Sequence, residues 1–219
     1  MTDARTGPQK GLPMEGLIAS WYARQTARDI EEFRQAARRI AAHLTSGSRV
    51  LEIAPGPGYL AIELARLTGG SVTGVDISRS FVRIAEENAR EAGVRASFEV
   101  GDAADLPFPD DQFDFIVCRA AFKNFGRPLV ALNEMRRVLK RGGTALIIDL
   151  RKDFSPQAIR DYVRGRRVLN AFIVRTIFGT VLKKRAYTPE SIMRLVAQSQ
   201  FGQGEIRLDP IGFELWLHK

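Results

Sequence analysis

The strongest constraint on this fold is a repeated alternation of apolar runs and helical segments between residues 48 and 150. The apolar runs are short and rich in β-branched and aromatic residues, as strands are. Repeated β-α units of this length predict a parallel, doubly wound sheet that binds ligands at the carboxyl ends of its strands. The expected strands span residues 49–54, 71–76, 96–100, 113–121 and 144–150.

The flanks of this core predict further elements. Two N-terminal helices precede it, and we expect Asp29 to cap the second, with Glu32 completing a capping box. Ser78 and Thr188 are expected to cap two later helices. The last sixteen residues predict two strands around a turn at Asp209–Pro210.

The predicted fold is therefore a Rossmann-like, mostly parallel seven-stranded sheet. N-terminal helices precede the core, and a helical insert and an antiparallel hairpin follow it. We expect a flexible tail (1–16) and one domain (17–219), made of a core (48–150), a basic helical insert (151–187), and a terminal helix and hairpin (188–219).

Composition limits where such a chain operates. The single cysteine, Cys118, excludes a disulfide framework and fits a reducing compartment. The N-terminus shows no apolar signal segment, and no apolar run is long enough to span a membrane. We therefore expect a cytoplasmic location.

The stretch VLEIAPGPGYLA, residues 50–61, joins the first strand to a helix. Gly56, Gly58 and Ala61 match the spacing of a dinucleotide fingerprint, and Asp76 lies about 20 residues further on, as that fingerprint requires. An NAD(P)-dependent oxidoreductase is therefore one hypothesis. Such an enzyme also needs a substrate domain, for which we expect no room in 219 residues.

Three carboxylates favour another ligand. Glu52 lies inside the first strand, Asp76 ends the second, and Asp102 follows the third. Such acids suit a ligand with a cationic amine, a ribose diol and an exocyclic amino group. They would repel a pyrophosphate, because the carboxylates and the pyrophosphate are both negatively charged.

With these residues in place, the chain resembles the class I S-adenosylmethionine (SAM) dependent methyltransferases. The resemblance lies in LEIAPGPG, GVDIS, GDAADLPFPDDQFDFIVC and LKRGG, which together span residues 48–150, about half of the chain. The subgroup that it resembles most includes the ubiquinone and menaquinone biosynthesis methyltransferases. The resemblance implies SAM as cofactor and S-adenosylhomocysteine as product, with no metal.

The resemblance also implies roles for individual residues. The loop backbone would wrap the methionine part of SAM, Glu52 would support the loop or the amino group, and Asp76 would bind the ribose hydroxyls. Ile77 would pack on the adenine and Asp102 would accept from its amino group. The implied cofactor-binding set is Glu52, Ala54, Pro55, Gly56, Gly58, Asp76, Ile77, Asp102, Ala103, the backbone of Arg119, and Tyr22, which would reach the SAM carboxylate.

One position departs from the family pattern. Ala54 stands where the family usually has its first glycine, and its methyl group could shift the loop. Pro55 and Pro57 stiffen the same loop by fixing φ near about −65°.

The sequence does not require a catalytic base. Methyl transfer depends mainly on alignment, and a base helps only if the acceptor carries a proton that must leave. The candidates near the acceptor are Lys123, Asn124, Tyr22 and Asp149. His43 and His218 are expected to be structural or exposed, and we expect a small, apolar or aromatic acceptor.

The basic insert has three interpretations. Residues 151–187 carry ten Lys and Arg against two Asp and Glu. The net charge of +8 on the whole chain is therefore concentrated in this segment. In the first, the insert is a helix packed on its own domain or on a second subunit of a homodimer. In the second, it is a lid over a lipophilic or aromatic acceptor. In the third, residues 160–185 contact a membrane surface or a nucleic acid. Nucleic acid is disfavoured, since the chain has no zinc motif and no aromatic-basic platform. A non-catalytic SAM-binding or membrane-associated protein stays an alternative.

Overall fold

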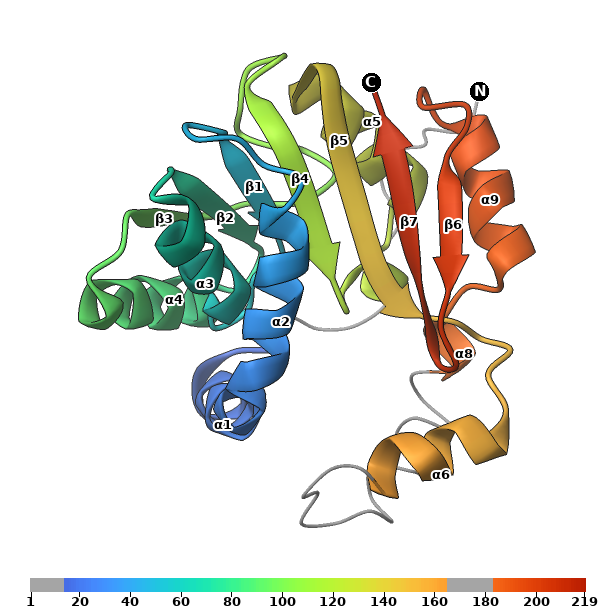
Figure 1. Ribbon diagram of the computed structural model, residues 1–219, viewed down its shortest axis with the longest axis horizontal. Coiled ribbons are helices and arrows are strands. Elements are labelled where there is room, and N and C mark those ends of the chain that lie inside the picture. Colours follow the sequence, from blue (N-terminus) through green and yellow to red (C-terminus); the bar gives the residue numbers. More distant parts are fainter. Residues whose placement is uncertain (1–13, 165–182) are drawn as a thin grey trace.

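A seven-stranded sheet runs through the described residues of the computed structural model, 14–164 and 183–219 (Figure 1). Its strand order is β3-β2-β1-β4-β5-β7-β6. The first five strands along the chain are parallel, and β7 runs antiparallel to both β5 and β6. The predicted doubly wound sheet with a C-terminal antiparallel hairpin is confirmed. The strands are β1 Val50–Ile53, β2 Val72–Asp76, β3 Ala96–Val100, β4 Phe113–Arg119, β5 Leu139–Leu150, β6 Glu205–Leu208 and β7 Gly212–His218.

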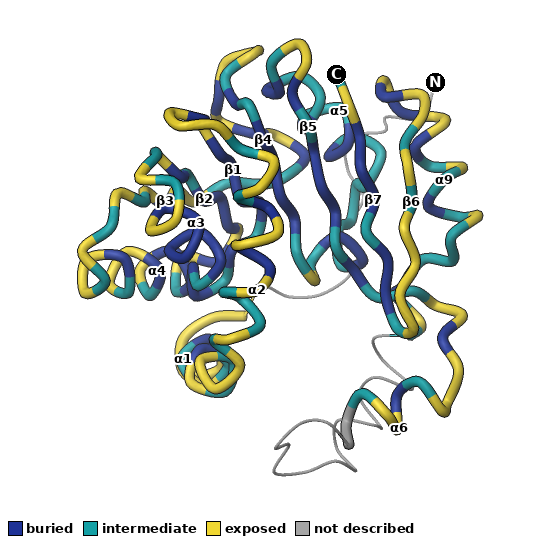
Figure 2. The backbone as a smooth tube through the Cα atoms, viewed as in Figure 1, coloured by how far each residue is buried: buried dark blue, intermediate teal, exposed yellow. Residues whose placement is uncertain are grey.

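Helices cover both faces of this sheet. One face packs against α2 (Ile30–Ala41), α3 (Tyr59–Thr68) and α4 (Arg79–Ala92), and the other packs against α5 (Pro128–Val138) and α9 (Pro189–Gln198). Each face has its own cluster of buried apolar residues. Figure 2 shows the central strands buried and the edge strand β6 largely exposed.

Other elements lie beyond the carboxyl ends of the parallel strands, at the lower end of Figure 1. They are α1 (Gly16–Thr26), which the 3-10 helix η1 (Ala27–Asp29) joins to α2, and also α6 (Pro156–Arg164) and α8 (Lys183–Arg185). A short 3-10 helix, η2 (Phe122–Asn124), follows β4. Residues 1–13 and 165–182, which include most of the expected tail and much of the expected insert, lie outside the described residues. Within the described ranges, no helix combines the length and the apolarity that crossing a bilayer requires.

Two of the three predicted helix caps are confirmed. The hydroxyl oxygens of Ser78 and Thr188 each accept a hydrogen bond from the backbone N–H three residues later. The cap predicted at Asp29 is wrong, since its side chain makes no capping hydrogen bond. The physical reason is that Ala27–Asp29 continues from α1 as a 3-10 helix, so α2 does not begin from an extended residue. Glu32 instead lies 3.5 Å from the Arg119 guanidinium.

The strand β5 begins five residues earlier than predicted. Leu139 already pairs with Phe113, and after a register shift Thr144 pairs with Phe115. The intervening residues form a bulge in which Gly142 has a φ of 76°. The segment LKRGG therefore belongs to β5.

Gly74 in β2 allows a close approach between the sheet and the loop that follows β1. A Cβ atom at this position would lie 2.5 Å from Cδ1 of Phe98 and 2.9 Å from Cγ of Pro55. Phe98 is buried, so its ring has little room to retreat. The small residue in β2 therefore sets the height at which Pro55 lies above the sheet.

Gly74→Ala is expected to lower the free energy of unfolding by about 1–3 kcal/mol, because overpacking a filled site forces its neighbours to move. Urea denaturation followed by circular dichroism would measure the change. Thr73→Ala, at the adjacent and partly exposed position, serves as the control and should cost less than about 1 kcal/mol. Equal stability of the Gly74→Ala variant and the wild type would contradict the packing described.

Candidate functional site

Four side chains from four elements gather at the carboxyl edge of the sheet. Glu52 comes from β1, Asp76 from β2, Arg119 from β4 and Tyr22 from α1. The charges of Arg119 and Asp76 act on both Glu52 and Tyr22. Parallel strands end at one edge, which explains why residues distant in sequence meet here. We call these four residues the edge cluster.

Asp76 holds the loop between β1 and α3 in place. Its Oδ2 accepts a hydrogen bond from the backbone N–H of Gly56 at 3.0 Å, and its Oδ1 accepts one from Ser78 at 2.9 Å. Burial raises the pKa of Asp76, while these two hydrogen bonds act in the opposite direction. Asp76 thereby connects the loop after β1 to the turn before α4.

The same loop has few backbone donors to offer a ligand. The N–H of Ala54 donates to the carbonyl of Val75 at 2.7 Å, and that of Gly58 donates to the carbonyl of Pro55 at 3.0 Å. The N–H of Gly56 is held by Asp76, and Pro55 and Pro57 have no N–H. From residue 54 to residue 58, every backbone donor is therefore used or absent.

The backbone of this loop is left-handed at alternate positions. The φ angles are 57° at Ala54, 54° at Gly56 and 80° at Gly58. Glycine adopts this conformation freely, but at Ala54 it costs about 1–2 kcal/mol. The methyl group of Ala54 is thus accommodated in a left-handed conformation, with strain stored at the site. At Gly58 a Cβ atom would lie only 2.9 Å from both Ala85 and Phe98.

Glu52 is a buried acid with an unused oxygen. Its residue is 3% exposed, and its Oε2 has no hydrogen-bond partner among the described residues. Burial raises the pKa of Glu52 to about 8 from an ordinary value of 4.5, although the N–H of Ala61 and the charge of Arg119 lower it. A cationic group beside Oε2 would satisfy the oxygen and favour the ionised form.

Arg119 directs its side chain toward α2. Its guanidinium lies 4.5 Å from the centre of the Phe33 ring and 3.5 Å from the carboxylate of Glu32. The sequence analysis assigned a role only to the backbone of Arg119, and it missed Glu32 and Phe33 as its neighbours. No local pattern indicates this contact, because α2 and β4 are far apart in sequence.

The residues expected around an adenine lie beside the edge cluster. Ile77 is 39% exposed, and Ala103 packs against the core. The carboxylate of Asp102 lies 2.8 Å from the guanidinium of Arg127, and it also accepts the N–H of Ala104 at 2.9 Å. Arg127 is a neighbour of the site that the sequence analysis missed.

Lys123 and Asp149 form a separate, buried ion pair. Lys123 Nζ lies 2.8 Å from Asp149 Oδ1, and the two side chains are 4% and 1% exposed. Asp149 also accepts the backbone N–H groups of Lys123 and Leu150, and the Lys123 ammonium donates to the carbonyl of Ala120. With these partners, the pair is built to support the turn after β4.

The remaining candidates divide between the two groups. Asn124, beside the ion pair, accepts a hydrogen bond from Arg185 at 3.4 Å. Tyr22 is the only one of the four catalytic candidates in the edge cluster. Burial raises the pKa of Tyr22, Arg119 lowers it and Asp76 raises it.

Aromatic rings lie next to the Lys123–Asp149 pair. The centre of the Phe122 ring is 5.2 Å from that of Phe125 and 5.8 Å from that of Tyr187. Burial raises the pKa of Tyr187, and the charge of Asp149 adds to the effect. These three residues form an aromatic wall at the carboxyl ends of β4 and β5.

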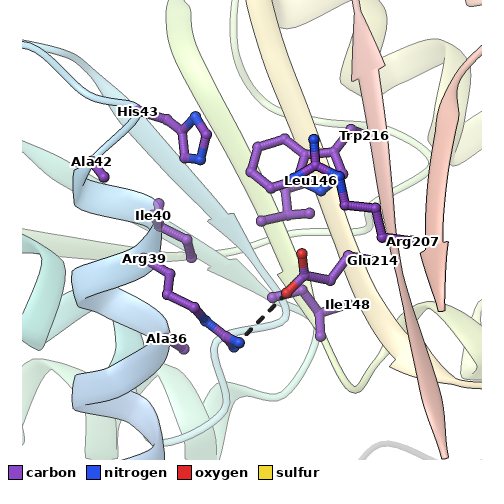
Figure 3. Close-up of a pocket in the computed structure, with 10 residues that line it drawn as sticks. All are labelled: Ala36, Arg39, Ile40, Ala42, His43, Leu146, Ile148, Arg207, Glu214 and Trp216. Atoms are coloured by element: carbon purple, nitrogen blue, oxygen red, sulfur yellow. Dashed lines mark ion pairs between the residues drawn. The ribbon is translucent and has the colours of Figure 1, made fainter. Parts of the chain in front are cut away.

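A cavity of about 280 Å³ lies elsewhere, between α2 and strands β5, β7 and β6 (Figure 3). Its charged residues are largely paired: Arg39 lies 3.8 Å from Glu214, and Arg207 lies over the Trp216 ring at 5.2 Å. None of the edge cluster lines it. The described residues also contain no group of three or more His, Cys, Asp or Glu side chains that could hold a metal ion.

Comparisons with known proteins show what the chain is similar to. Residues 50–143 match a family described as a methyltransferase domain. The chain is 38% identical over 114 residues to 2-phytyl-1,4-naphtoquinone methyltransferase of Synechococcus elongatus, covering 50% of this chain and 49% of that protein. It is 32% identical over 157 residues to ubiquinone/menaquinone biosynthesis C-methyltransferase UbiE of Neisseria meningitidis, covering 69% and 62%. The chain thus spans about half to three fifths of the length of these curated relatives.

A solved structure shows the same fold. It comes from Methanococcus maripaludis and is named only provisionally as an S-adenosyl-L-methionine-dependent methyltransferase. The TM-score is 0.73 at 21% identity, and the match covers 95% of each chain. At this identity the likeness concerns the fold alone.

Glu52→Gln is expected to flatten the dependence of stability on pH. Because the pKa of Glu52 is raised to about 8 in the folded protein, the folded state binds more protons than the unfolded state between pH 4.5 and 8. Wild-type stability should therefore fall as pH rises through this window, by up to about 1.4 kcal/mol per unit from this residue. Urea denaturation across the window would measure it. The exposed Glu86→Gln control should keep the wild-type slope, and the same slope in Glu52→Gln would contradict the assignment.

Removing one partner of the Lys123–Asp149 pair should destabilise the protein strongly. Asp149→Ala is expected to cost about 3–5 kcal/mol, since it leaves a buried ammonium without its counter-charge. The double variant Lys123→Met/Asp149→Ala should cost less than the sum of the single variants in thermal denaturation. A loss of activity with unchanged stability would instead indicate a direct catalytic role.

Proposed function

The chain belongs to the class I S-adenosylmethionine-dependent methyltransferases, and we propose that it transfers the methyl group of SAM to a small aromatic acceptor of the quinone type. The family assignment rests on the matched segment, the two curated relatives and the shared fold. The acceptor class is proposed from the names of those relatives together with the chemistry of the site.

The observation that carries the proposal is the unpartnered Oε2 of Glu52. A buried polar atom without a partner is costly, so its presence favours a ligand that supplies one. The ammonium group of SAM has the required charge and donors. In this arrangement Glu52 binds the ammonium, and the nearby Arg119 and Tyr22 bind the carboxylate of the same amino acid.

Asp76 suits the ribose of the cofactor. Each of its oxygens accepts one backbone hydrogen bond and keeps lone-pair capacity for a hydroxyl group. Ile77 offers an apolar surface to the adenine. Asp102 and Ala103 would lie at the adenine edge, with Arg127 fixing the Asp102 carboxylate.

A dinucleotide fits this loop poorly. The pyrophosphate of NAD is usually held by free N–H groups at the loop and the helix N-terminus. Here the loop donors are used or missing, and the N–H of Ala61 points to Glu52. Although the glycine spacing matches the dinucleotide fingerprint, the occupied and missing donors of this loop disfavour a phosphate.

When bound, SAM supplies a methyl group on a positively charged sulfur, and the acceptor displaces that sulfur from the methyl carbon in line. The chain contributes mainly alignment. Phe125 and Tyr187, the partly exposed rings of the aromatic wall, would stack on a planar acceptor. Phe122 is buried behind them, and the Lys123–Asp149 pair keeps the turn that carries Phe122 rigid. The cytoplasmic location, the homodimer and the role of the insert, residues 151–187, as a lid stay predictions.

Purified protein is expected to release S-adenosylhomocysteine with reduced naphthoquinones or benzoquinones, in preference to aliphatic amines and acids.

Asp76→Ala should weaken S-adenosylhomocysteine binding by about 1–3 kcal/mol in calorimetric titration, as when buried ligand hydroxyls lose a charged partner. Asp105→Ala, an exposed acid in the loop after β3, is the matched control and should bind normally. Tight NADH binding without S-adenosylhomocysteine binding would overturn the proposal.

A further inference from the structure

The helix α1 has an inner face that is fixed to the domain. Ala19 and Ala23 are buried, and the Tyr22 ring packs edge-on against Phe81 with 5.7 Å between ring centres. The carbonyl of Ala23 accepts a hydrogen bond from the Tyr59 hydroxyl at 3.0 Å. This side of α1 therefore joins the edge cluster to α3 and α4.

The start of the helix is fixed as well. The carbonyl of Met14 accepts a hydrogen bond from the Ser78 hydroxyl at 2.6 Å. The Glu15 carboxylate accepts the N–H groups of Arg79 and Ser80, each at 3.1 Å. The two residues that precede α1 are thus bound to the N-terminus of α4.

The outer face of α1 is apolar and exposed. Met14, Leu17, Ile18 and Trp21 are 38%, 86%, 63% and 57% exposed. Leu17, Ile18 and Trp21 lie on one side of the helix, because Trp21 follows the other two by four and three residues, and Met14 lies just before the helix begins. We call these four residues the outer stripe. They are half of the eight large apolar side chains that are exposed in the described part of the chain. A concentration of this kind on a rigid element marks an interaction surface.

Cations continue the outer stripe along the same segment. Arg24 and Arg28 are exposed one and two turns after Trp21. The exposed Asp29 follows Arg28, and the Glu15 carboxylate before α1 keeps its charge while it accepts two backbone N–H groups. The outer stripe is therefore followed, on the same segment, by two exposed arginines.

We propose that the outer stripe of α1 docks on the surface of an anionic lipid bilayer. Leu17 and Ile18 enter the boundary between headgroups and acyl chains, Trp21 lies at headgroup level, and Arg24 and Arg28 contact the lipid phosphates. The charge distribution favours this partner over an apolar protein groove, which would complement the stripe but not the cations. The surface is distinct from the membrane contact expected at 160–185, much of which lies outside the described residues. The proposal does not depend on the acceptor or on methyl transfer.

Co-sedimentation with vesicles tests the proposal. Wild-type protein should bind vesicles of phosphatidylcholine with phosphatidylglycerol, and it should bind pure phosphatidylcholine vesicles several-fold more weakly. The variant Leu17→Gln/Ile18→Gln/Trp21→Gln should lose at least about tenfold in partitioning, because the inserting side chains are gone. The control variant Leu67→Gln/Leu208→Gln removes two side chains that are 49% and 50% exposed elsewhere, and it should partition like the wild type.

A second readout locates the contact. Trp21 and Trp216 are the two tryptophans of the chain, so Trp216→Phe leaves Trp21 as the single reporter. Its fluorescence should shift to the blue on anionic vesicles. Wild-type protein that fails to sediment, or a triple variant that sediments equally well, would overturn the proposal. So would a wild-type dimer, absent from the triple variant, that does not bind vesicles, since the stripe would then join two copies of the chain.

The triple variant should still bind S-adenosylhomocysteine. Such binding would show that the variant is folded and that only docking is lost. Vesicle binding by a wild type that does not bind S-adenosylhomocysteine would leave the docking surface standing and would contradict the proposed function alone.

Discussion

The two backbone hydrogen bonds that Asp76 accepts fix the geometry on which the site depends. One comes from Gly56 in the loop after β1, and the other comes from Ser78 in the turn before α4. Since the carboxylate is buried, water competes little for these bonds. A single acid at the end of β2 thus arranges two neighbouring connections, and in doing so it uses one of the few N–H groups that a phosphate could have bound.

Packing from below complements this hydrogen bonding. Gly74 and Gly58 leave room for the Phe98 ring, and Pro55 rests close to Gly74. The loop is therefore held at the height of the sheet by close contact and in its left-handed conformation by Asp76. Ala54 keeps that conformation despite its methyl group, which indicates that the surroundings, rather than the residue's own preference, determine the backbone here.

Features that depend on local sequence patterns can be predicted from the sequence, and features that depend on contacts between distant elements cannot. The strand positions and the caps at Ser78 and Thr188 follow from apolar periodicity and from side chains three residues away from their partners, so they were predictable. The gathering of Glu52 and Asp76 follows from the common edge of parallel strands. The direction of Arg119 toward Phe33, the pairing of Lys123 with Asp149 and the early start of β5 depend on elements far apart in the chain. The Asp29 cap failed because the neighbouring α1 continues into the turn where the cap was expected.

The order of strands in the sheet has a consequence for synthesis of the protein. β5 is an interior strand with buried residues such as Leu146 and Ile147, yet its partner on one side is β7, which is made more than 60 residues later. Until β7 pairs with it, a nascent chain presents a long apolar strand with unpaired backbone groups along one side. Such an edge is a template for pairing with other chains. Protection against aggregation therefore comes from β7, the last strand along the chain. Interruption of translation before residue 212 would remove this protection.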